Sequence, residues 1–203
     1  NKNVQLTYTV TDDNELQIAY EVTSDQKTLI NMTNHSYFNL AGHDSGNIEG
    51  HRLSIHASHY TPIFERLIPT GELADVTGTP FDFRTMKVIG EDINQDNVQL
   101  GYGQGYDHNY ALDGFDGTIQ KAASVEEPTT GRKMDVYTDQ PGLQFYAGNC
   151  ITPQIGKGGA AYGKRSGLCL ETQCFPDAIN QPQFQNVIYG PERPYKTTTI
   201  YKF

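Results

Sequence analysis

Four ionisable residues stand where strand-like runs of the sequence meet loops: His35, Asp107, His108 and Glu171. Asp107 and His108 are neighbours, so in a strand they point to opposite faces and only one can serve a given pocket. A glutamate that is removed from water acquires a raised pKa suited to proton transfer, and a histidine can supply the complementary acid. These residue types predict an acid–base pair acting across a small substrate. The alternation around Glu171 by itself favours the alternative that this side chain lies on the solvent-facing side of its strand.

His35 belongs to an unusual stretch, residues 31–42, which holds one histidine, three asparagines, two hydroxyl side chains and two aromatic rings. Asparagine and serine weaken a strand, so folding alone rarely asks for this mixture. A histidine among hydrogen-bonding partners can carry a proton near neutral pH. The stretch therefore indicates a site, and an edge strand running into a polar turn is the alternative.

Other kinds of site find little support. The histidines at positions 51, 56 and 59 are too irregularly spaced for zinc, and no nucleophile elbow is present. The glycine-rich run 99–105 joins a loop to a strand, whereas phosphate-binding runs join a strand to a helix. The three cysteines, Cys150, Cys169 and Cys174, are an odd number without disulfide or metal spacing, so we expect reduced thiols that serve packing. We therefore expect no metal site.

Period-2 alternation predicts an all-β chain. Residues 4–10 and 16–22 alternate on either side of a polar turn and predict a β-hairpin. Only residues 86–94 suggest a short helix, and five glycines between residues 153 and 167 predict a long, mobile loop. Further strands are predicted at residues 28–32, 52–57, 117–125, 133–138, 143–146, 168–173 and 196–203. We expect one domain spanning residues 1–203, a large antiparallel β-sandwich.

Composition narrows the classes of partner. Twenty glycines, ten prolines and thirteen tyrosines favour strands and turns, and a formal net charge of −9 argues against a nucleic-acid groove. The acidic balance suits a neutral substrate better than a phosphorylated one. No apolar run approaches the roughly 20 residues of a membrane helix, and no signal-peptide pattern is present. We expect a cytoplasmic protein without a membrane partner, and secretion remains open.

The segment Asn34–Gly42, with sequence NHSYFNLAG, closely resembles the central motif of the aldose 1-epimerases, or galactose mutarotases. Four further segments resemble this family, in the family's order, and together they reach from about residue 4 to the end. They are Ile68–Glu72, Tyr106–Asn109, Gln140–Tyr146 and Leu170–Pro182. The resemblance implies a large β-sandwich that interconverts the α and β anomers of hexoses such as galactose and glucose, without a cofactor.

The resemblance also implies roles for single residues. Glu171 would be the base that takes the proton from the anomeric hydroxyl, and His35 the acid that protonates the ring oxygen. Asp107 and Gln144 match residues that hydrogen-bond the sugar. The aromatic side chains of Tyr37 and Phe175 could stack on the sugar ring, although packing in the core is the better expectation for both.

The sequence departs from the family in one respect. The family carries an upstream segment of well over a hundred residues, with an arginine and a second histidine that help to bind the sugar, and nothing here matches it. The chain is therefore expected to correspond to the C-terminal part of the fold, without its N-terminal strands. We expect a separate N-terminal polypeptide to complete the sandwich. The alternatives are a sugar-binding β-sandwich without turnover and an epimerase of hexose 6-phosphates.

Overall fold

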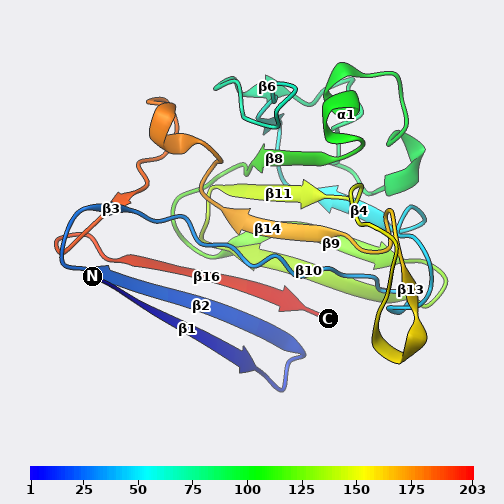
Figure 1. The fold of residues 1–203 in the computed structure, drawn as a ribbon, viewed down its shortest axis with the longest axis horizontal. Helices are drawn as coiled ribbons and strands as arrows, with labels where there is room; N and C mark the ends of the chain where they lie inside the picture. The colour runs from blue at the N-terminus through cyan, green and yellow to red at the C-terminus, as the bar shows by residue number, and fades with distance from the viewer.

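Alternating apolar residues build the larger of the two main antiparallel sheets. The computed structural model describes residues 1–203. Seven strands are ordered β1-β2-β16-β10-β9-β4-β7, and β1 lies at one edge (Figure 1). In chain order they are β1 (Lys2–Val10), β2 (Glu15–Ser24), β4 (Arg52–Ile55), β7 (Lys87–Val88), β9 (Gln120–Glu127), β10 (Arg132–Thr138) and β16 (Tyr195–Lys202). Strands β1 and β2 form the predicted hairpin, paired from Lys2–Ser24 to Val10–Leu16.

The second sheet has five strands in the order β14-β11-β8-β5-β6, so that β14 lies at its edge. Its strands are β5 (His59–Tyr60), β6 (Ala74–Asp75), β8 (Asp107–Ala111), β11 (Gly142–Tyr146) and β14 (Cys169–Gln173). The two sheets pack against each other around one apolar core, to which both contribute buried side chains. Tyr201 of β16 donates a hydrogen bond to the carbonyl of Leu170 in β14, at 2.8 Å, and so joins the sheets. The predicted antiparallel β-sandwich is confirmed.

Aromatic rings fill much of the core beneath β8 and β11. Tyr106 stacks on Phe145 with ring centroids 5.2 Å apart, and Phe83 meets the ring of Phe145 edge to face at 5.6 Å. Such offset and edge-to-face arrangements are the favoured geometries of aromatic pairs. The core therefore supports one face of β8 and β11 rigidly. Their opposite face does not pack on this core and is available to carry a site.

The prediction of a helix over residues 86–94 was wrong. Those residues form β7 and a 3-10 turn at Ile89–Glu91, while the α-helix α1 lies at Val98–Gly103. The side chain of Asn97 accepts hydrogen bonds from the backbone N–H groups of the helix's second and third residues, which starts α1 despite its glycines. Gln104, with a φ of 55°, ends it in the left-handed conformation. The local cap outweighed the low helix propensity of glycine.

Two other stretches differ from expectation. The segment predicted as a long loop contains a two-stranded hairpin, β12 (Gln154–Ile155) and β13 (Ala161–Tyr162), turned by a 3-10 helix at Lys157–Gly159. The predicted strand 28–32 is only β3 (Thr28–Leu29), paired with β15 (Ile188–Tyr189). A third 3-10 helix lies at Ala178–Asn180. No helix in the structure combines the length and apolarity that crossing a membrane requires.

Candidate active site

The stretch that contains His35 runs along the free edge of β14 and is fastened to it at both ends. At one end the Asn31 side chain donates to the carbonyl of Cys174 and accepts from its N–H, each at 2.9 Å. At the other end Phe38 and Leu168 exchange two backbone hydrogen bonds of 2.8 and 2.9 Å. His35 lies between the two fastenings. The stretch is thus held in register with β14 without forming a continuous strand.

The asparagines of this stretch serve its backbone. Asn34 accepts from the N–H of Ser36, and Asn39 accepts from the N–H of Ala41 while donating to the carbonyl of Ser166. Asparagine side chains of this kind replace ladder hydrogen bonds by local ones and so favour turns. The polar composition that marked the stretch in the sequence is therefore largely what bends it over β14.

Strand alternation places Glu171 on the face of β14 that points away from the sandwich core. Leu170 and Thr172 point into the core, and Glu171 points the other way, as on the solvent-facing side considered from the sequence. Its side chain is nevertheless only 9% exposed. The overlying His35 stretch, rather than the core, keeps water away from this carboxylate.

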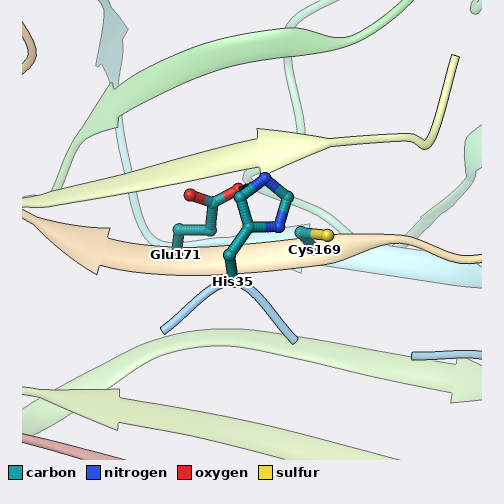
Figure 2. A group of neighbouring side chains, drawn as sticks. All are labelled: His35, Cys169 and Glu171. Carbon is teal, nitrogen blue, oxygen red and sulfur yellow. Dashed lines mark ion pairs between the residues drawn. The ribbon is translucent and has the colours of Figure 1, made fainter. Parts of the chain in front are cut away.

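The imidazole of His35 and the carboxylate of Glu171 meet directly, with Nε2 and Oε1 3.3 Å apart (Figure 2). Half of the His35 side chain is exposed, so the pair is reached from solvent on the imidazole side. Burial raises the pKa of Glu171, to about 7, because the ionised form loses its hydration; the charge of His35 opposes this rise and that of Asp107 adds to it. The carboxyl is thereby tuned to exchange protons near neutral pH.

Asp107 and Gln144 lie on the same face as Glu171. In the sheet register Gln144 of β11 is paired with Glu171, and Asp107 of β8 is paired with Tyr146. The Gln144 amide donates to Asp107 Oδ1 at 2.8 Å. Burial raises the pKa of Asp107, while the Gln144 hydrogen bond and the charge of His35 counteract the rise. The structure thus brings together His35, Asp107, Gln144 and Glu171.

His108 takes the opposite direction from Asp107, as the strand pattern predicted. It is completely buried in the core against Phe81, with ring centroids 4.6 Å apart. Burial lowers its pKa to about 3, so it stays neutral. His51 is also buried, and its Nε2 accepts a hydrogen bond from the N–H of Leu40 at 3.0 Å. Both histidines serve the fold.

Aromatic rings border the acid–base pair. Tyr37 is exposed and stacks on His35 at 5.1 Å, and the ring of Tyr146 stands edge-on to both. The expectation that Tyr37 packs in the core was therefore wrong, whereas Phe175 is buried against Phe184 as expected. An exposed ring next to a polar pair can stack on a flat, partly apolar ligand.

Three residues of this face escaped the reading of the sequence: Cys169, Gln173 and Tyr146. Cys169 and Gln173 are two residues before and after Glu171 on β14, and Tyr146 is two residues after Gln144 on β11. Gln173 Nε2 donates to Gln144 Oε1 at 3.5 Å. The period-2 rule could have found them, because a site residue in a strand places its i±2 neighbours on the same face.

Known proteins resemble this chain along its whole length. The sequence profile of the aldose 1-epimerase family matches residues 2–202. Over 203 residues the chain is 46% identical to the galactose mutarotase of Homo sapiens, covering 98% of this chain and 57% of that protein. Over 205 residues it is 37% identical to the aldose 1-epimerase of Escherichia coli K12, covering 100% of this chain and 59% of that protein.

Solved structures agree with the sequence relatives. A galactose 1-epimerase from Lactobacillus acidophilus superposes with a TM-score of 0.82 at 30% identity, covering 100% of this chain and 57% of that one. An aldose epimerase homologue from C. elegans gives a TM-score of 0.88 at 27% identity, covering 99% and 59% of the two chains. The chain thus spans less than two thirds of the length of these relatives. Given the profile match and the shared fold, the chain belongs to the aldose 1-epimerase family.

Proposed function

We propose that this chain carries the acid–base centre of an aldose 1-epimerase, which interconverts the α and β anomers of hexoses such as galactose and glucose. The observation that carries the proposal is the 3.3 Å contact between His35 Nε2 and Glu171 Oε1. In a cyclic sugar the anomeric hydroxyl oxygen and the ring oxygen are bonded to the same carbon. An acid and a base that serve these two atoms must therefore lie side by side, as this pair does.

In the proposed reaction the Glu171 carboxylate takes the proton of the anomeric hydroxyl while His35 donates a proton to the ring oxygen. The bond between the ring oxygen and the anomeric carbon breaks, which leaves the open-chain aldehyde. Rotation next to the aldehyde carbon presents its other face, and closure with both proton transfers reversed gives the other anomer. The raised pKa of Glu171 suits this cycle, because the same group must accept and return a proton.

Asp107 and Gln144 are proposed to bind sugar hydroxyls from the floor of the site. Their mutual hydrogen bond of 2.8 Å fixes the amide of Gln144 and leaves the second carboxylate oxygen of Asp107 for the ligand. The exposed ring of Tyr37 can stack on one face of the sugar. Two carboxylates on this face favour a neutral hexose over a hexose 6-phosphate.

The activity is proposed for this chain completed by an N-terminal segment, since the relatives named above are longer. We also propose, as a partner, a separate N-terminal polypeptide that completes the sandwich. The β1 edge supports this proposal: Val4, Leu6, Tyr8 and Val10 form an apolar row of which at least 44% of each residue is exposed. An uncovered edge strand offers unpaired backbone groups to another chain.

A cytoplasmic location is proposed as well. Cys150, Cys169 and Cys174 are all free thiols, a state typical of reducing compartments. Cell fractionation with an antibody against this chain tests the location, and recovery only from the culture medium or the periplasm would contradict it.

Polarimetry tests the function. Freshly dissolved α-D-galactose and α-D-glucose should approach their final rotation faster with the protein present. Glu171→Gln should lower the rate about 100- to 10,000-fold, because it removes the base and keeps the shape. Glu65→Gln, at an exposed position, is the matched control and should not change the rate. Sugar binding without acceleration by the full-length protein would instead identify a binding module.

A further inference from the structure

Cys169 adds a third donor atom beside the acid–base pair. Cys169 is completely buried, and its side chain lies on the same face of β14 as that of Glu171, two residues away. The Cys169 sulfur, one His35 nitrogen and one Glu171 carboxylate oxygen all lie within 4.8 Å of one another. In Figure 2 the imidazole stands over β14, between the carboxylate and the thiol.

These separations approach those of a tetrahedral metal centre. Zinc binds nitrogen and oxygen at about 2.0–2.2 Å and sulfur at about 2.3 Å, which places neighbouring ligand atoms about 3.3–3.8 Å apart. His35 Nε2 and Glu171 Oε1 are already 3.3 Å apart. Donor atoms of the cluster that are now up to 4.8 Å apart have to approach by at most about 1.5 Å, a distance that side-chain rotation can supply.

The three donors are held on a framework that favours this closure. Glu171 and Cys169 share one strand of a packed sheet, whose other face lies on the core. His35 comes from the stretch fastened at Asn31 and Phe38. Its half-exposed imidazole gives a cation a route from solvent and leaves room for a fourth ligand, such as water.

We propose that His35, Cys169 and Glu171 form a three-ligand site for a thiophilic divalent cation such as Zn²⁺ or Cd²⁺, whose binding blocks the sugar site. One nitrogen, one sulfur and one oxygen are donors that zinc and its heavier congener prefer, whereas Mg²⁺ and Ca²⁺ require oxygen ligands. The negative charge of Asp107, on the same face, adds to the attraction for a cation. Blocking follows because two of the ligands are the proposed acid and base, so this part rests on the proposed function.

Cadmium binding can be measured without turnover. A thiolate bound to Cd²⁺ produces an ultraviolet charge-transfer band, so titration of the reduced protein with Cd²⁺ should give one saturable band that EDTA removes. Cys169→Ser should abolish the band. Cys150→Ser, which removes an exposed thiol, is the matched control and should keep both the band and the affinity.

A second variant covers the case in which Cys169→Ser does not fold. His35→Gln changes a half-exposed side chain and keeps the thiol, so the band should persist while the affinity for Cd²⁺ falls at least about 10-fold. A band that is lost in Cys150→Ser, or an affinity unchanged in both Cys169→Ser and His35→Gln, would overturn the site.

Inhibition is measured separately, by polarimetry. Zn²⁺ should slow the mutarotation catalysed by the wild-type protein, EDTA should restore the rate, and galactose should weaken Cd²⁺ binding. Cd²⁺ binding at the cluster without any effect on a working enzyme would overturn the blocking role. Cd²⁺ binding in a full-length protein that shows no turnover would leave the metal site standing and refute the proposed function.

Discussion

Replacing Glu171 by glutamine should make the protein more stable at alkaline pH, although it removes the proposed base. In the folded state burial raises the pKa of Glu171 from 4.5 to about 7. The native state therefore holds this proton more tightly than the unfolded state does. The free energy of unfolding must then fall as the pH rises from about 4.5 through about 7, and it stays low above that range. Glutamine has the same shape without the ionisation.

The size of the effect follows from the pKa difference. Each pKa unit corresponds to about 1.4 kcal/mol, so the shift gives at most about 3.5 kcal/mol. The substitution also removes the attraction to His35, whose half-exposed side chain leaves the contact partly in water. We expect a gain of about 1 to 3 kcal/mol at about pH 8, or at least about 2 °C in melting temperature.

Urea unfolding at several pH values provides the assay. The difference between Glu171→Gln and the wild-type protein should grow from about pH 5 to about pH 8 and vanish near pH 4. Glu65→Gln, at an exposed position, should show no such dependence. If Glu171→Gln unfolds at the same or lower urea concentration at pH 8, the carboxylate is not destabilised by burial, and the account of its pKa fails.

Three further outcomes are expected. The value of kcat/KM should fall as the pH drops below about 7, because protonated Glu171 cannot act as a base; a flat profile down to pH 5 would contradict this role. Asp107→Asn should raise the KM for galactose about 10- to 100-fold in polarimetric assays, since a hydrogen bond to a charged acceptor is lost; an unchanged KM would remove Asp107 from the sugar site. Arg165→Met should lower the free energy of unfolding by about 2 kcal/mol, because it leaves the buried side-chain oxygen of Asn149 and the carbonyl of Gln104 without their donor; urea unfolding checks this, and a change below about 0.5 kcal/mol would refute it.

The strands could be predicted because they depend on local periodicity, whereas the expected site residues came mainly from the resemblance to the epimerase motifs. Alternation along residues 4–10 and 16–22 corresponds to the β1–β2 hairpin, and the opposite directions of Asp107 and His108 follow from the same rule. The resemblance of residues 34–42 pointed to His35. Periodicity could not show which segment packs against each face of a strand, because the two sheets and the His35 stretch come together only through contacts between residues far apart in the sequence.

The features that the sequence did not predict depend on individual contacts that periodicity does not reveal. The helix α1 contains Gly101 and Gly103, which are weak helix formers, and begins where the side chain of Asn97 caps its first turn, so its sequence lacks the pattern of a strong helix. Glu171 is buried on the side of its strand that faces away from the core, because a segment 136 residues earlier in the sequence, around His35, covers it. The proximity of Cys169 depends on the same crossing, so spacing alone could not show three donors together.

The fastening of the His35 stretch has a consequence for aggregation. β14 is the edge strand of its sheet, and an edge strand can recruit strands of other molecules through its free backbone groups. Hydrogen bonds from Asn31 to Cys174 and between Phe38 and Leu168 occupy part of that edge. The residues that hold the histidine in place thus also shield the sheet from self-association. A substitution that releases this stretch should therefore lower the amount of soluble protein through aggregation, in addition to impairing the proposed activity.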